Sequence, residues 1–145
     1  MWIGTASIGL MTITTVFFDW IPTKLNRNIE TMTVKERLPS TVIHGSLGLF
    51  FSIVHALNWK WVVFVGSIWY SFILVMAVIN WWIPYFFGIH YGEITVEDYD
   101  NHYANNLIIL PRIGNNPIVP DVQHTLIHLT VLIAVVCSWI TFVIL

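Results

Sequence analysis

The 145-residue sequence has few charged side chains and only one cysteine. Charged residues make up 10% of the chain, whereas a typical soluble domain contains about 25%. The single cysteine, Cys137, excludes an intramolecular disulfide and a cluster of thiolate ligands for a metal. The net charge of −2 provides no basic surface of the kind that nucleic acid requires. We therefore expect neither a disulfide-stabilised domain nor a nucleic-acid partner.

Apolar residues dominate instead and account for 57% of the chain. A helix needs about 20 apolar residues to cross the hydrocarbon core of a membrane. The stretches that meet this requirement are Met1–Ile21, Leu38–Leu57, Trp61–Tyr85 and Val122–Leu145. Tryptophan and tyrosine side chains mark their ends, as is typical of membrane interfaces. The sequence therefore predicts a single domain over residues 1–145, an all-α bundle of four transmembrane helices embedded in a lipid bilayer.

The distribution of lysine and arginine predicts the orientation of this multi-pass protein. Five of the six basic residues lie in the first and third connections, and only Lys60 lies in the short turn on the other side. Basic residues accumulate in cytoplasmic loops. We therefore expect both termini on the non-cytoplasmic side of the membrane.

The connection between the third and fourth apolar stretches is the longest one. Within it, Thr95 followed by Asp98 is typical of a helix N-cap with an acidic partner three residues later. Apolar residues then recur at helical spacing as far as Leu110. We expect a short cytoplasmic helix over about residues 96–109, which packs as a lid under the bundle.

Polar side chains converge on the membrane face that this lid would cover. In a four-span protein, the end of the first helix, the start of the second, the end of the third and the start of the fourth share one face. A helix rises about 1.5 Å per residue. Counted from the ends of their helices, His44, Asn80 and His128 therefore lie at similar depths below the same membrane face. Ionisable groups at such depths are costly and usually functional. We predict one polar site near the cytoplasmic face, formed by Asp19, His44, Asn80, Asp121, His124 and His128.

Several of these residue types bind transition metals. His124 and His128 are one helical turn apart, and neutral imidazole is a good ligand for zinc or iron. We predict His44 as a third ligand, with Asp19 or Asp121 as oxygen ligands and Asn80 in support. A single haem held by His44 and a facing histidine is the main variant of this hypothesis. A site without any cofactor also stays open, and Asp121 is equally explained as an acid in the first helical turn.

The long connection supplies candidate catalytic groups for an enzyme that uses no metal. His90, Glu93, Glu97 and His102 could serve as general acids or bases beside a lipid headgroup. Arg112 could bind a phosphate or a carboxylate there. All five residues are also ordinary for a solvated loop. The leading hypothesis, however, is a metal-dependent, membrane-embedded enzyme that uses the polar site near the cytoplasmic face and acts on a lipid or another hydrophobic small molecule.

Other functional classes remain open at this point. A small homo-oligomeric transporter or proton-coupled carrier could use Asp19 and the histidines to relay protons. A haem-binding or anchoring subunit is the third class. We attribute the small and hydroxyl-bearing residues of the helices, such as Gly48, to close helix packing, and we expect His55 to be a solvated or hydrogen-bonded residue near the opposite interface.

Overall fold

The structure, a computed structural model, describes residues 2–145, and among these residues it contains helices and loops but no strand. Met1, which we predicted in the first helix, lies outside the described residues. The helices that are long and apolar enough to cross a membrane are α1 (Trp2–Trp20), α2 (Val34–Leu57), the continuous helix Lys60–Phe87 and α6 (Val122–Ile144). The predicted all-α architecture with four membrane-spanning helices is confirmed, and the chain is a polytopic membrane protein.

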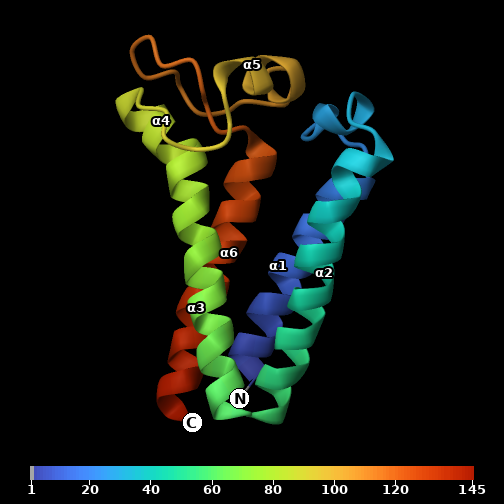
Figure 1. Ribbon diagram of the computed structural model, residues 1–145, viewed down its shortest axis with the longest axis vertical. Coiled ribbons are helices and arrows are strands. Elements are labelled where there is room, and N and C mark those ends of the chain that lie inside the picture. Colours follow the sequence, from blue (N-terminus) through green and yellow to red (C-terminus); the bar gives the residue numbers. More distant parts are fainter. Residues whose placement is uncertain (1) are drawn as a thin grey trace.

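The helices form two pairs that diverge toward one end of the bundle (Figure 1). Helix α1 packs against α2 and α6, and the helix that starts with α3 (Lys60–Ala77) packs against α6. Helices α2 and α3 contact each other little, although a short turn joins them. These two helices are neighbours only close to their turn (Figure 1).

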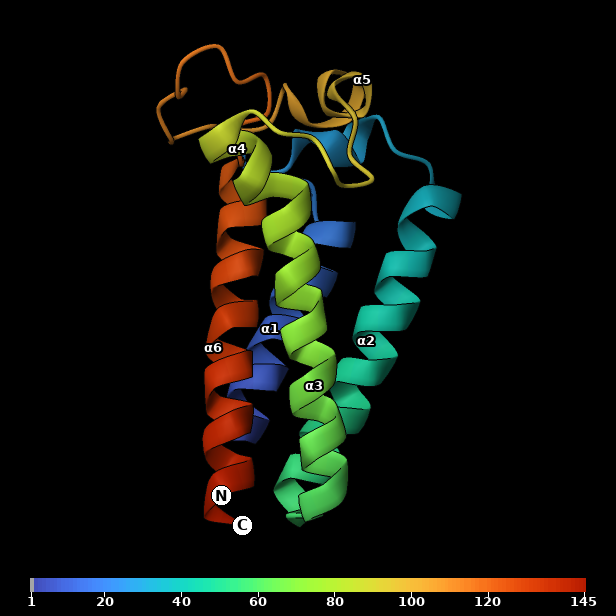
Figure 2. The same cartoon turned by 60° about the vertical axis from the view of Figure 1, so that its left-hand side comes forward.

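The two ends of the bundle differ in their connections. The chain termini and the turn between α2 and α3 lie at the narrow end, which we call the hairpin end (Figures 1 and 2). The two longer connections cover the wide end, which we call the lid end (Figure 2). The side of the membrane on which each end lies stays a prediction.

Helix α2 begins at Val34, four residues before the apolar stretch that we used to place its start. The Glu36 carboxylate accepts a hydrogen bond from the backbone N–H of Thr33 at 2.6 Å. Such a bond satisfies one of the N–H groups that lack a partner at a helix N-terminus. The helix therefore starts outside the apolar stretch, because hydropathy marks only the part that suits hydrocarbon.

The third membrane helix contains a wide turn where it approaches the lid end. Helix α3 continues into the π-helical turn η2 (Val78–Trp82) and then into α4 (Ile83–Phe87). The N–H of Ile83 bonds to the carbonyl of Val78, five residues back. Pro84 lacks an N–H, and its ring would clash with the Asn80 carbonyl four residues earlier in a regular helix, so the wide turn relieves this conflict. The helix ends at Phe87, two residues beyond the predicted end at Tyr85, and Gly88 caps it with a φ of 69°.

The lid helix is shorter than expected. Its predicted N-cap is confirmed, since the Thr95 hydroxyl accepts a hydrogen bond from the Asp98 N–H at 3.0 Å. Helix α5 (Val96–Asp98) leads into the π-helical turn η3 (Tyr99–Tyr103), and the helix stops there rather than near residue 109. The chain leaves the helix because the side chain of Asn106 turns into the interior and accepts a hydrogen bond from the Asn28 N–H at 2.8 Å.

At the hairpin end, polar groups are buried and paired with one another. His55 is 0% exposed, and its Nδ1 bonds to the Phe51 carbonyl while its Nε2 bonds to the Ser138 hydroxyl, each at 2.8 Å. The Ser138 hydroxyl also lies 2.7 Å from that of Ser67. This network joins α2, α3 and α6. Gly4 on α1 completes the packing, because a Cβ there would lie 2.5 Å from Cδ2 of His55.

Candidate functional site

A cleft with a volume of about 520 Å³ lies between the α1–α2 pair and the α3–α6 pair. Small-molecule sites in proteins have volumes of about 300–1,000 Å³. Toward the lid end the cleft is lined mostly by polar side chains, which are Asn28, Asp19, Glu36, Arg37, Ser40, His44, Asn80, Tyr103, Gln123, His124 and His128. Toward the membrane centre its lining is apolar and includes Met11, Trp69, Phe72, Ile73 and Val131. The cleft is therefore amphipathic along its length.

The structure brings most of the predicted polar residues to this cleft. Asp19, His44, Asn80, His124 and His128 all contribute to its lining. They come from all four membrane helices, as the topological argument required. Their functional role stays a prediction.

The candidate catalytic groups of the third connection lie elsewhere. None of His90, Glu93, Glu97, His102 and Arg112 is among the residues that line the cleft. All of them except the half-buried His102 are exposed. The third connection lies over the end of the bundle, and the side chains that it directs inward are those of Tyr103 and Asn106. The five candidate catalytic residues therefore lie outside the cleft.

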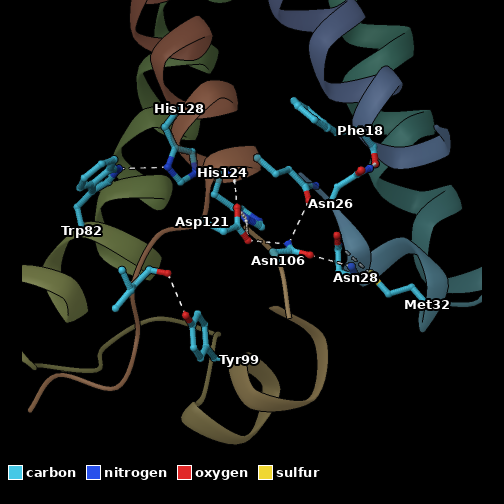
Figure 3. A network of polar contacts seen from close by, with 12 residues as sticks. Phe18, Asn26, Asn28, Met32, Trp82, Tyr99, Asn106, Asp121, His124 and His128 are labelled. Carbon is cyan, nitrogen blue, oxygen red and sulfur yellow. Dashed lines mark hydrogen bonds and ion pairs between the residues drawn. The ribbon is translucent and has the colours of Figure 1, made fainter. Parts of the chain in front are cut away.

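Asp121 and His124 form the best-defined pair beside the cleft (Figure 3). Asp121 is the N-cap of α6, and one carboxylate oxygen accepts a hydrogen bond from the His124 backbone N–H at 2.7 Å. The same oxygen lies 2.9 Å from Nδ1 of the imidazole. The side chain of Asp121 is 0% exposed and that of His124 is 15% exposed. The carboxylate thus sits behind the imidazole, which separates it from solvent.

The surroundings of Asp121 keep it ionised. Its other carboxylate oxygen accepts a hydrogen bond from the Asn106 amide at 2.7 Å. Burial raises the pKa of this carboxyl, but the charge and hydrogen bonds of His124, together with the Asn106 amide, lower it by more. The pKa of Asp121 therefore lies below its ordinary value of 3.8. A charged carboxylate at Nδ1 requires a proton on that nitrogen, so Nε2 is the basic atom of neutral His124.

Aromatic rings fix the plane of the His124 imidazole. The Trp81 ring stacks on it with a centroid distance of 3.8 Å and an angle of 25° between the planes. The Tyr103 ring meets it edge to face at 5.0 Å. Trp81 comes from the wide turn η2 and Tyr103 from the lid. Local features of two other segments therefore hold His124 in place.

His128 has the opposite tautomer. The indole N–H of Trp82 donates a hydrogen bond to its Nδ1 at 3.1 Å (Figure 3). Because Nδ1 accepts, the proton of the neutral ring resides on Nε2. His128 is 8% exposed and its ring centroid lies 5.9 Å from that of His124. One cleft is thus lined by two histidines, one with a basic Nε2 and the other with a donor Nε2–H.

Asp19 and His44 line the opposite wall of the cleft. The Asp19 carboxylate accepts a hydrogen bond from the Thr41 hydroxyl at 2.8 Å, and Thr41 in turn accepts one from the indole N–H of Trp20. The imidazole of His44 lines the cleft beside this carboxylate's helix. This wall therefore holds a second acid–imidazole combination, with the carboxylate fixed by α2.

Asn80 fastens the loop that follows α4. Its side-chain oxygen accepts a hydrogen bond from the Glu93 N–H at 2.7 Å, and its amide donates to the Met76 carbonyl at 2.9 Å. A Cβ at Gly92 would lie only 2.1 Å from this oxygen, so the chain must have a glycine where it passes. Asn80 thus positions the loop at the edge of the cleft.

The predicted metal ligands do not form a ready-made group among the described residues, and metal binding there stays a prediction. Within residues 2–145, no three histidine, cysteine, aspartate or glutamate side chains form a group that could hold a metal ion. Nδ1 of His128 already accepts a hydrogen bond, and Asp121 faces Nδ1 of His124. The haem hypothesis, which needs only two facing imidazoles, stays a prediction.

Sequence reasoning missed the residues that hold the two histidines. Trp81 and Trp82 were assigned to the membrane interface, and Asn106 was placed within the lid helix. The position of Pro84 was the available signal, because a proline there predicts a disturbed turn over the preceding residues. For Asn106 the signal was weak, since its partners are 78 and 15 residues away.

Comparison with known proteins does not assign the chain to a family. No family model matches the chain, and neither a curated protein nor a solved structure matches it. The functional argument therefore rests on the geometry of the cleft.

Proposed function

We propose that this membrane protein is an acid–base enzyme that acts on the polar end of a hydrophobic or amphipathic substrate bound in the cleft. The observation that carries the proposal is the pair of Asp121 and His124 on the cleft wall. A buried carboxylate at Nδ1 orients an imidazole and stabilises the positive charge that it acquires as a base. That arrangement is used by enzymes that remove a proton from a hydroxyl group or from water.

His128 supplies the complementary function. Its Nε2–H can donate a hydrogen bond, whereas Nε2 of His124 can accept a proton. A base and a hydrogen-bond donor that line one cleft suit a reaction in which a nucleophile loses its proton to His124 and the leaving group regains that proton from there. His128 stabilises the negative charge that develops in between. In this proposal His124 is the general base and, once protonated, the general acid, and His128 is a hydrogen-bond donor to the negative charge that develops. Asp121 is a positioning residue.

The shape of the cleft favours a substrate with an apolar portion. Its lining changes from polar at the lid end to apolar toward Met11 and Val131. The cleft also narrows toward the hairpin end, where α1, α2 and α6 pack closely at Gly4. A polar group would therefore reside at the lid end while the apolar portion extends toward the membrane centre.

The test is chemical turnover in reconstituted vesicles. Purified protein is incubated in vesicles made from the total membrane extract of its expression host, and mass spectrometry follows every lipid and small hydrophobic compound over time. We expect one class to be converted. His124→Gln should slow the conversion by about 100-fold or more, as the loss of a general base does.

The matched control is His90→Gln, which replaces an exposed histidine outside the cleft. It should leave the rate unchanged. Equal rates for His124→Gln and His90→Gln, or no conversion by the wild-type protein, would contradict the proposal.

A further inference from the structure

Neighbouring helices around the cleft differ in how closely they pack. Helix α1 contacts both α2 and α6, and α3 contacts α6, although the two pairs diverge toward the lid end (Figure 1). Only α2 and α3 make little contact above their turn, and both line the cleft. The cleft therefore has a lateral mouth between α2 and α3.

Residues at the edges of this mouth reach both the cleft and the outer surface. Ile43 on α2 is 47% exposed and Phe72 on α3 is 54% exposed, and both line the cleft. Both belong to the membrane-spanning segments. Their exposed neighbours on the same helices are apolar, for example Leu49 on α2 and Val65 on α3. The mouth thus opens toward the hydrocarbon of the bilayer.

The lid end of the cleft is covered by chain. Tyr103 of the lid contributes to the lining there, as do Asn28 and Met32 of the first connection. The Asn106 side chain ties these two connections to α6 through hydrogen bonds to Asn28 and Asp121. These connections therefore cover much of the lid end, while the lateral route toward the membrane centre passes apolar side chains.

We propose that the occupant of the cleft is an acyl lipid of the surrounding bilayer, which enters sideways between α2 and α3 and places its polar end beside His124 and His128. This rests on the proposed function and names its substrate class. A lipid in the leaflet at the lid end already has its headgroup and chain at the depths where the lining is polar and apolar. It can enter without leaving its leaflet, and its chain lies against Trp69, Ile73 and Val131.

The test uses photo-crosslinking in intact membranes. Cells that express the full chain are fed palmitic acid with a diazirine on the alkyl chain, so that their acyl lipids become photoreactive. After irradiation, mass spectrometry maps the lipid adducts.

Val131 is 2% exposed and Met11 is also 2% exposed, and both line the cleft. Only a chain inside the cleft reaches them, whereas annular lipid reaches Val65. Adducts on Met11 and Val131 are expected, and adducts confined to exposed positions would overturn the inference.

Two substitutions on α2 test the lateral route. Ile43→Trp enlarges a side chain at the mouth and should reduce the adducts on Met11 and Val131 at least tenfold. Leu49→Trp makes the same change at an exposed site outside the cleft and should leave them unchanged. Phe72→Trp on the other edge provides a second blocking variant if Ile43→Trp does not fold. Equal adduct yields for blocking and control variants would overturn sideways entry.

A final variant separates this inference from the proposed function. His124→Gln should abolish turnover while the adducts on Met11 and Val131 persist. If wild-type protein forms these adducts but converts no lipid, the lipid site stands and the acid–base function fails. If conversion occurs without these adducts, the function stands and the lipid site fails.

Discussion

His44 and His55 share one face of α2, about 20° apart around the helix axis, yet their surroundings are opposite. His55 at the hairpin end is fully buried, and both of its ring nitrogens are hydrogen-bonded. His44 at the lid end is half-buried, lines an open cleft and has no hydrogen bond among the described residues. The same residue type on one helical stripe is thus part of the packing at one end and available to a ligand at the other.

The helix arrangement explains this difference. At the hairpin end, glycine and serine let α1, α2, α3 and α6 approach closely, and every ring nitrogen of His55 finds a partner. At the lid end, the two helix pairs diverge and leave a cavity of about 520 Å³ between them. Buried polar groups stabilise a membrane protein where they are paired, and bind ligands where they are not.

The largest expected effect on stability is at His55. His55→Ala removes two hydrogen bonds, leaves a cavity and deprives the Ser138 hydroxyl of a partner. It should lower the free energy of unfolding by about 3 kcal/mol. His44→Ala, on the same face of the same helix, should change it by less than about 1 kcal/mol. Thermal unfolding in detergent measures both, and equal losses would contradict the division between the two ends.

A smaller effect is expected from an added methyl group at the hairpin end. Gly4→Ala would place its Cβ 2.5 Å from the His55 ring and 2.7 Å from the Thr141 hydroxyl. Overpacking of this kind costs about 1–3 kcal/mol. The control is Gly9→Ala on the same helix, where the nearest atom would lie 4.0 Å away. We expect the control to be as stable as wild type in the same unfolding assay, and an equally stable Gly4→Ala would show that the helices are not in close contact there.

The smallest effect is a pH-dependent one at the lid end. Because the folded-state pKa of Asp121 lies below 3.8, its carboxylate stabilises the fold above that pH, and the contribution is lost as the pH falls through the lower folded-state value. Asp121→Asn should therefore cost about 1–2 kcal/mol at neutral pH and progressively less in acid. A difference in unfolding temperature between the two proteins that is constant from pH 7 to pH 3 would refute this role for the carboxylate.

The sequence carries enough information for the membrane fold but not for all of the site. Long apolar stretches determine where helices cross the membrane, so their number and approximate positions follow from composition. The Thr95–Asp98 cap is a local pattern and is likewise predictable. The end of the lid helix at Tyr103 depends on Asn106, whose partner Asn28 is far away in the sequence. Local periodicity cannot encode such a contact.

The candidate site shows the same limit. Equal depth on helices of known direction brings His44, His124 and His128 to one end of the bundle. The roles of the two histidines on α6 depend on Trp81 and Trp82, which a wide turn before Pro84 directs toward them. The separation of α2 from α3 depends on the packing of all four helices, so it cannot be predicted from any short stretch of sequence.

The most direct test of this account is the protonation pattern of the two histidines on α6. Nitrogen-15 NMR of histidine-labelled protein in lipid, with the His124→Gln and His128→Gln variants for assignment, reports which ring nitrogen carries the proton in each neutral imidazole. The account predicts a protonated Nδ1 and a bare Nε2 for His124, and the reverse for His128. The same tautomer at both positions, or a proton on Nε2 of His124, would contradict the proposal that the cleft offers one base and one hydrogen-bond donor.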